Sequence, residues 1–219
     1  TDLGLPGVQE KLIAAVADVG KPVILVLVNG RPAAIPDVTE KVNAILEAWI
    51  PGEEGARAVV DALFGKVNPG GKLPLSIPRS AGQVPVFYNH KPSGMRSNIF
   101  GDYYNEPVKP LFAFGHGLSY STFQFTDLSI DKPSYRGGET IKITLKIKNT
   151  GKLKGDEVVQ LYVRDEIASL PRPVKELKDF IRVTMDPGES KIITFQMKTD
   201  HLAYYDEDME LMVEPGKFK

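Results

Sequence analysis

The feature that most constrains the fold is a change in hydrophobic period near residue 119. Before it, apolar residues form a continuous run from Val23 to Val28 and recur at helical spacings; after it, they alternate with polar residues. A period of two places alternate side chains on opposite faces of a strand, whereas spacings of three and four place them on one face of a helix. We therefore expect an α/β region followed by an all-β region.

Residues 1–80 predict part of an α/β domain with a mostly parallel sheet. The run Val23–Val28 is typical of a strand buried on both faces, as in a parallel sheet covered by helices. Ala44–Trp49 predicts a second, weaker strand. Leu73–Ile77 predicts a short edge strand, because Pro74 cannot donate a hydrogen bond within a central ladder.

Two amphipathic helices are predicted in the same region. The first carries an apolar stripe between residues 8 and 16 and ends at Gly20, and the second carries one between residues 56 and 64 and ends at Gly65. Glu53 and Glu54 are expected in the first turn of the second helix, where carboxylates interact favourably with the helix dipole. The stripes comprise Val8, Leu12, Ile13 and Val16, and Ala56, Val59, Val60, Leu63 and Phe64.

Residues 81–118 lose all periodicity but are rich in aromatic side chains. Leaving so many rings exposed in one segment would be costly, so we expect an ordered connection whose rings pack against something. An irregular segment of this length usually has a functional or interdomain role. The rings are Tyr88, Phe100, Tyr103, Tyr104, Phe112 and Phe114.

Residues 119–219 predict an antiparallel β-sandwich. Alternating segments recur with turn signals between them, including Asp186-Pro187-Gly188-Glu189. The apolar positions are Ile141, Ile143, Leu145 and Ile147; Val159, Leu161 and Val163; Ile181, Val183 and Met185; and Ile193, Phe195 and Met197.

Composition excludes several classes of function. Lys plus Arg is 27 and Asp plus Glu is 28, so the balanced charge gives no reason to expect nucleic acid or a membrane as partner. The chain has no cysteine, which excludes disulfides, thiolate metal sites and cysteine nucleophiles. No apolar run is long enough to span a bilayer. No basic and apolar leader stands at Thr1, so we expect any export signal to be missing or already removed.

Motifs for common chemistry are absent. The sequence has neither glycine-rich phosphate motif and no G-x-S-x-G nucleophile elbow. His90, His116 and His201 are widely spaced in turn-like sequence, which favours surface residues over a catalytic triad or a metal site. The acidic residues between 206 and 210 favour a solvated loop, because they lack the ordering of a calcium loop.

One local cluster has the composition of a sugar-binding site. Asp102 and Glu106 flank Tyr103 and Tyr104, and sugar sites combine aromatic rings with carboxylates. Asp102, Tyr103 and Tyr104 are therefore the candidate substrate-proximal residues.

An ordered series of short motifs resembles the C-terminal half of glycoside hydrolase family 3 enzymes of the β-glucosidase and β-xylosidase type. Each motif alone is weak, but the ordered set is specific and extends over the whole chain. The motifs are Leu5-Pro6-Gly7-Val8-Gln9, Gly20-Lys21-Pro22-Val23, Asn29-Gly30-Arg31-Pro32, Trp49, Pro51-Gly52-Glu53-Glu54-Gly55, Leu63-Phe64-Gly65, Asn68-Pro69-Gly70-Gly71-Lys72-Leu73-Pro74, 110–120, Arg172-Pro173-Val174-Lys175-Glu176-Leu177 and Pro187-Gly188-Glu189.

This resemblance implies an architecture of a TIM-like barrel, an α/β sandwich and often a fibronectin type III-like domain. It also implies a retaining mechanism, with an Asp nucleophile on the barrel and a Glu acid/base on a loop of the α/β domain, held about 5–5.5 Å apart. No segment of this chain matches the barrel, and the acid/base loop of the family precedes the segment that matches Leu5–Gln9. No catalytic residue is therefore assigned, no cofactor or metal is implied, and the last strand of the sandwich (119–219) is expected to be missing.

The leading hypothesis is a non-catalytic C-terminal part of a retaining β-glucosidase-like enzyme that hydrolyses terminal β-linked sugars. By itself the chain is expected to be inactive, to expose an apolar face and to associate. Its expected partners are the saccharide substrate, a barrel domain in cis or as a separate chain, and a second copy in a homo-oligomer. The resemblance favours a periplasmic or secreted location. Two alternatives stay open: a stand-alone carbohydrate-binding or scaffolding module, and an independent α/β enzyme that uses Asp102 or Glu106.

Overall fold

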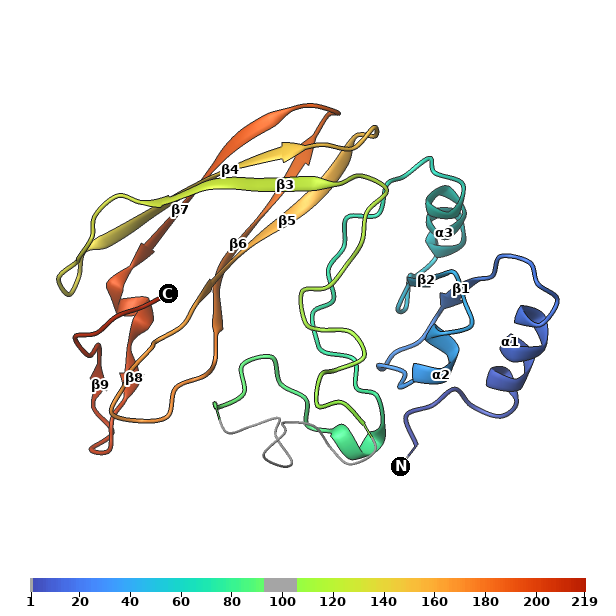
Figure 1. The fold of residues 1–219 in the computed structure, drawn as a ribbon, viewed down its shortest axis with the longest axis horizontal. Helices are drawn as coiled ribbons and strands as arrows, with labels where there is room; N and C mark the ends of the chain where they lie inside the picture. The colour runs from blue at the N-terminus through green and yellow to red at the C-terminus, as the bar shows by residue number, and fades with distance from the viewer. Residues whose placement is uncertain (1, 93–105) are drawn as a thin grey trace. The chain divides into compact units, whose positions relative to one another are not determined.

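The computed structural model describes residues 2–92 and 106–219, which form two compact units. Within the described residues, the α/β unit comprises 2–67, 73–88 and 106–116, and the sandwich unit comprises 68–72, 89–92 and 117–219. An α/β fold followed by an antiparallel sandwich confirms the predicted fold class. Figure 1 shows the helices and strands of both units, coloured from the N-terminus to the C-terminus.

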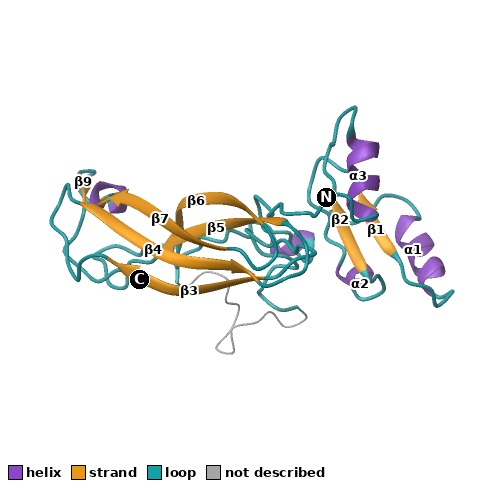
Figure 2. Cartoon of the chain, turned by 90° about the horizontal axis from the view of Figure 1, so that it is seen from above, coloured by secondary structure: helices purple, strands orange, loops and turns teal. Residues whose placement is uncertain are grey.

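The sheet of the α/β unit is a parallel pair, as predicted. β1 (Ile24–Leu27) pairs with β2 (Ala44–Glu47) so that Ile24 lies opposite Ala44 and Leu27 lies opposite Glu47. The helices of this unit are α1 (Gln9–Ala17), α2 (Pro36–Thr39), α3 (Gly55–Leu63) and the 3₁₀ helix η1 (Ala81–Gln83) (Figure 2).

Two strand predictions in this unit were wrong in part. β1 is not buried on both faces, since Ile24 is 54% exposed and Leu27 alone in this strand is buried. Helices must cover both faces of a parallel sheet to bury it, and α1 has no buried side chain. Residues 73–77 do not form a strand, because the backbone bends at residues 74 and 75. Ile77 makes a single bridge to Phe112, and prolines at positions 74 and 78 interrupt the donors that a ladder needs.

Both predicted helices are present, with differences in detail. Most of the predicted stripe is exposed, since the N-cap Val8 is 70% and Leu12 is 63% exposed, whereas Ile13 packs in part against the core of the unit. α3 begins at Gly55 with Glu54 as its N-cap, so Glu54 precedes the first turn instead of lying within it. A Cβ at Gly55 would lie 2.5 Å from the Pro51 ring, which explains the glycine there.

The α/β unit has a small core around α2, a helix that sequence patterns did not predict. Its buried side chains are Leu27, Ala33, Ile35 and Val38, and Leu5, Ile13, Leu25, Val42, Ile45 and Leu111 pack against them in part.

The sandwich unit has the predicted alternating strands in two sheets. One sheet has the order β3-β4-β7 and the other pairs β5 with β6, all antiparallel (Figure 2). β3 and the hairpin β8–β9 were missed, because they lack a clean alternating pattern. The bounds are β3 (Phe123–Ile130), β4 (Thr140–Asn149), β5 (Gly155–Val163), β6 (Glu176–Met185), β7 (Ser190–Lys198), the 3₁₀ helix η2 (Thr199–Leu202), β8 (Tyr204–Tyr205) and β9 (Leu211–Met212).

The core of the sandwich consists of the inward positions of the alternating pattern. Ile147 and Met185 are fully buried, and Phe195 is 2% exposed. Val159 from β5 packs in the same cluster, so both sheets contribute. The predicted alternation therefore identified the core-facing side of β4, β5, β6 and β7.

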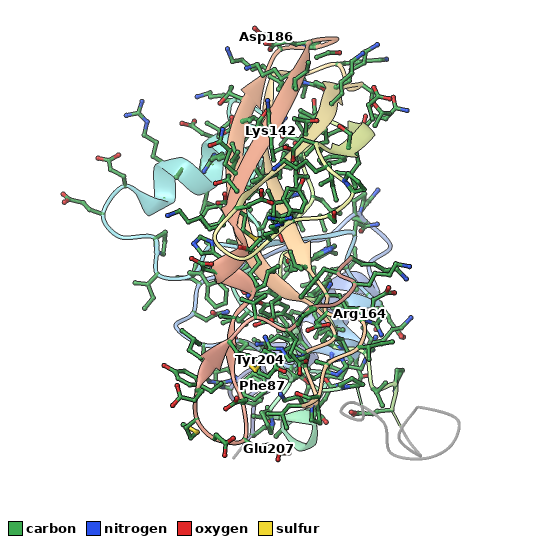
Figure 3. The ribbon with its side chains drawn as sticks, turned by 90° about the vertical axis from the view of Figure 1, so that its left-hand side faces the viewer. Phe87, Lys142, Arg164, Asp186, Tyr204 and Glu207 are labelled. Atoms are coloured by element: carbon green, nitrogen blue, oxygen red, sulfur yellow. The ribbon has the colours of Figure 1, made fainter. Side chains whose placement is uncertain are left out.

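The acidic segment near the C-terminus is the β8–β9 turn. One carboxylate oxygen of Asp206 accepts the backbone N–H groups of Asp208 (3.0 Å) and Glu210 (2.9 Å). Figure 3 shows Glu207 at one end of the sandwich unit and Asp186, in the β6–β7 turn, at the other. The solvated-loop interpretation is supported, and within residues 2–92 and 106–219 no cluster of acidic or histidine side chains could hold a metal. None of the described helices is long and apolar enough to cross a membrane.

Candidate functional site

Of the candidate residues from the sequence, three lie outside the residues that the structure describes and one lies within them. Asp102, Tyr103 and Tyr104 lie outside the described residues. Glu106 lies inside them, and its carboxylate accepts a hydrogen bond from the Ser80 hydroxyl at 2.9 Å. Ser80 in turn lines a hollow in the α/β unit, which therefore becomes the candidate site.

The hollow has a volume of about 280 Å³ and carries four ionisable side chains. Three segments line it, residues 2–4, 34–38 and 79–81, together with Glu10. The charged groups are Asp2, Glu10, Asp37 and Arg79, and the buried side chains Ile35 and Val38 supply apolar lining. This set was not predicted from the sequence, because its members are spread between residues 2 and 81 without a shared motif.

One wall of the hollow is held by Arg31. Its guanidinium donates to the carbonyl oxygens of Leu3 and Gly4, both at 3.1 Å. The Leu3 carbonyl also accepts the N–H of Ala34 at 2.9 Å. These bonds fix the segment at residues 2–4 against the loop that precedes α2.

The opposite wall is fixed by Gln83, whose side chain is 3% exposed. Its amide nitrogen donates to the Val108 carbonyl at 2.9 Å, and its amide oxygen accepts the N–H of Arg79 at 2.8 Å. Arg79 Nε donates to the Lys109 carbonyl at 3.1 Å. Because these bonds hold the backbone and Nε of Arg79, the guanidinium has a defined position at the hollow.

The chemistry of the hollow suits an uncharged, hydroxyl-rich ligand. Carboxylates accept hydrogen bonds from hydroxyl groups, and a guanidinium donates several in a fixed plane. Small-molecule sites usually combine a few placed polar groups with apolar lining, as here. The geometry supports binding and orientation, and we assign none of these carboxylates an acid/base role.

A second polar group lies at the carboxyl ends of β1 and β2, the edge where open parallel sheets usually bind ligands. Glu47 Oε1 accepts the Trp49 N–H at 3.1 Å, and Asn29 Nδ2 donates to Glu47 Oε2 at 3.4 Å. Burial raises the pKa of Glu47, and these two hydrogen bonds oppose the rise. Trp49 has a φ of 51°, so the carboxylate braces a left-handed backbone that is unusual for a bulky residue.

Of the rings predicted to pack, Tyr88, Phe112 and Phe114 are described and all three are stacked, whereas the neighbouring Phe87 is 63% exposed. Tyr88 and Phe114 stack with ring centroids 4.2 Å apart, and Phe112 stacks on His116 at 5.5 Å. Phe100, like Tyr103 and Tyr104, lies outside the described residues. His116 is exposed, which agrees with its interpretation as a surface residue.

Comparison with protein families matches both units. Residues 1–120 match the glycosyl hydrolase family 3 C-terminal domain, and residues 157–219 match the fibronectin type III-like domain.

Individual relatives align with nearly the whole chain. A periplasmic β-glucosidase of Salmonella typhimurium is 42% identical over 224 residues, covering 100% of this chain and 29% of its own length. A β-xylosidase of Formosa agariphila is 46% identical over 217 residues, covering 99% of this chain and 30% of its own length.

Solved structures agree. The β-glucosidase of Listeria innocua in complex with glucose has a TM-score of 0.93 at 38% identity, covering 99% of this chain and 31% of that one. A β-glucosidase of Erythrobacter marinus has the same TM-score at 40% identity, covering 99% and 28%. The chain spans about 30% of the length of the relatives it matches. The chain therefore belongs to glycosyl hydrolase family 3, and it corresponds to the C-terminal part of these glycosidases, with a C-terminal domain and a fibronectin type III-like domain.

Proposed function

We propose that this chain is a non-catalytic part of a retaining glycosidase that hydrolyses terminal β-linked glucose or xylose residues. In this proposal the catalytic carboxylates come from a barrel domain and from a loop outside residues 1–219. The α/β unit contributes a wall of the saccharide site, and the hollow that contains Arg79 is the observation that carries the proposal.

The apolar surface of the α/β unit supports a role beside another domain. Leu12 of α1, Ile50 after β2 and Phe64 after α3 are 63%, 78% and 79% exposed. Apolar side chains exposed in this number mark interaction surfaces in soluble proteins. A barrel domain that packs on this unit would bury them.

The charge pattern of the hollow supports contact with a neutral sugar. Ring hydroxyls of glucose or xylose can donate to Asp2 or Asp37 and accept from Arg79. The names of the relatives, β-glucosidases and β-xylosidases, agree with a sugar of this class.

A binding experiment tests the role of the hollow. We expect glucose, xylose or laminaribiose to shift the NMR resonances of the Arg79 side chain in the chain as it stands, and Arg79→Ala to abolish the shifts elsewhere in the hollow. Arg57→Ala is the matched control, since Arg57 is an exposed residue of α3 whose only recorded ion pair in the described residues is with Asp61 at 3.8 Å. Sugar-dependent shifts that survive Arg79→Ala would contradict the proposal.

A second experiment tests the absence of catalysis. Purified residues 1–219 should release nitrophenol from nitrophenyl β-glucoside and β-xyloside no faster than buffer does. Retardation of the chain on β-glucan gels would favour the stand-alone binding module instead, because such a module must bind the polysaccharide without any other domain.

A further inference from the structure

The outer face of the sheet β3-β4-β7 carries a row of lysines, of which Lys142 is labelled in Figure 3. On β4, Lys142, Lys146 and Lys148 occupy exposed positions that alternate with core-facing residues, so they lie on one face. Lys198 of β7 is also exposed and lies opposite Thr140, which continues the row by one position. Because a strand rises about 3.4 Å per residue, these four residues, which we call the lysine row, cover about 27 Å.

The ammonium groups of the lysine row are not neutralised by the chain itself. None of the four forms an ion pair with a residue that the structure describes, whereas lysines in the turns of the same unit do. Lys132 lies 3.2 Å from Glu139, and Lys154 lies 3.3 Å from Asp186. The chain as a whole has a net charge of -1, so positive charge is concentrated on this face of the sandwich unit.

The carboxylates on the β3 side of the row bind other donors. Asp131 follows β3, and its Oδ1 accepts the backbone N–H of Lys142 at 2.9 Å and the hydroxyl of Tyr135. Asp127 lies at the β3 bulge, and its Oδ2 accepts the Thr126 hydroxyl at 3.2 Å. These hydrogen bonds use local backbone and hydroxyl donors, so the lysine side chains stay available to an anion from outside.

The side chains around the lysines are hydrogen-bonding groups. Thr144 lies opposite Thr194, and Lys142 lies opposite Gln196 in the register of β4 and β7. Ile192, which is 76% exposed, is the one apolar side chain among the outward positions of these two strands. The face therefore combines cations with hydroxyl and amide groups, which bind the anionic groups and the hydroxyls of a ligand respectively.

We propose that the lysine row binds a linear anionic polysaccharide that lies along β4, with its carboxylate or sulfate groups against the ammonium groups. A membrane surface is a poorer fit, because peripheral membrane proteins insert several apolar or aromatic side chains and this face offers Ile192. Single-stranded nucleic acid usually stacks on aromatic rings, and the outward positions of β4 and β7 carry none. This surface does not involve the hollow at Arg79, so the inference goes beyond the proposed function.

Binding to charged and neutral polymers tests the proposal. Residues 1–219 are passed over immobilised polygalacturonate, dextran sulfate and uncharged dextran in biolayer interferometry at low salt. We expect binding to at least one of the two anionic polymers, which identifies the anionic group, and none to dextran. The affinity should fall as salt is added, because the charges on this face are exposed and therefore screened.

Two triple variants with the same change of net charge separate the lysine row from a general charge effect. Lys142→Gln, Lys146→Gln and Lys148→Gln together should weaken binding about 10-fold. Lys11→Gln, Lys21→Gln and Lys41→Gln, at exposed positions of the α/β unit, should weaken it less than about 2-fold.

NMR of the unsubstituted chain locates the bound polymer without a variant. The methyl resonances of Thr144 and Thr194, which lie between the lysines, should shift when the polymer is added. Absence of binding to both anionic polymers, equal weakening by the two variants, or unshifted threonine methyls would overturn the proposal. So would tighter binding to phosphatidylserine vesicles or to single-stranded DNA than to either polysaccharide.

Discussion

The two units differ in how much of their apolar surface they bury. In the sandwich unit, β4 pairs along its whole length with β7, and Phe195, Ile147 and Met185 are buried almost completely. In the α/β unit, α1 has no fully buried side chain, and of its apolar stripe Leu12 and Val16 are exposed while Ile13 packs in part against the core. The hydrophobic effect scales with the apolar area removed from water, so the sandwich supplies most of the stability of this chain.

The difference follows from the two kinds of sheet. A parallel two-stranded sheet needs helices and further strands on its faces, whereas an antiparallel sandwich closes around its own core. The α/β unit is therefore expected to be the less stable of the two, and the sandwich is more fully buried except along β3, where Phe125, Leu128 and Ile130 are exposed. The experiments that follow test this difference in buried apolar surface between the two units.

The largest effect is expected for a core truncation in the sandwich. Phe195→Ala removes a ring that is 2% exposed, and it should lower the free energy of unfolding by about 4 kcal/mol, because a cavity remains. Leu12→Ala is the matched truncation in α1 and should change it by less than about 0.5 kcal/mol. Denaturant unfolding, followed by far-UV circular dichroism of the strands, measures the free energy of unfolding of the sandwich.

Fluorescence provides the matching probe for the other unit. The chain has one tryptophan, Trp49, and it lies in the α/β unit. Comparable losses from Phe195→Ala and Leu12→Ala, each read by its own probe, would break the contrast between the units.

The next effect concerns an ion pair that closes the sandwich unit. Lys72 Nζ lies 3.0 Å from Glu157 Oε1 and donates to the Gly117 carbonyl at 2.7 Å, and both charged side chains are more than four-fifths buried. Lys72→Met should cost about 3 kcal/mol, because it leaves the Glu157 carboxylate buried without its partner.

A double variant separates the net contribution of the ion pair to stability from the cost of leaving one of its charges buried without a partner. Lys72→Met combined with Glu157→Leu should recover most of the loss, since replacing a buried pair by apolar side chains is often neutral. A double variant as unstable as the single one would show that packing at these positions, and not an orphaned charge, sets the cost.

Strands with a clean alternating pattern were predictable from sequence, because their period reports burial directly. β4 and β7 alternate over their whole length, and both were predicted. β3 was missed because its inner face stays exposed and a bulge at Asp127, with a φ of 57°, breaks its period. A local hydrophobic pattern predicts a strand only where the fold buries one face of that strand and leaves the other face in solvent.

The candidate site was much less predictable. Asp102, Tyr103 and Tyr104 were selected from local composition, and they stay predictions. Arg79 was missed, because its place at the hollow depends on the bonds that Gln83 makes to Val108 and Lys109, about 25 residues later in the chain. Contacts at such separation have no signature in a single sequence.

The smallest effect is a difference in pH dependence between the units. In the sandwich, hydrogen bonds from Thr184 and Arg182 hold the pKa of Asp156 below its usual range. In the α/β unit, burial raises the pKa of Glu47. Asp156 thus contributes stability that is present above the usual carboxyl pKa and is lost as pH falls through its own lowered pKa. Glu47 acts in the opposite direction, because its ionisation as pH rises through its raised pKa costs stability.

Neutral substitutions should therefore have opposite signs. At pH 7, Asp156→Asn should destabilise the sandwich by about 1 kcal/mol, and Glu47→Gln should stabilise the α/β unit by about 0.5 kcal/mol, a small value because Glu47 is partly solvated. Both differences should vanish in acid where both carboxyls are protonated. Unfolding by circular dichroism for Asp156 and by Trp49 fluorescence for Glu47, at pH 7 and in acid, measures them. A loss of stability at pH 7 from Glu47→Gln would mean that the ionised carboxylate is needed to hold the left-handed backbone at Trp49. Hydrogen bonding at this edge of the α/β unit would then stabilise it more than its small buried apolar surface does.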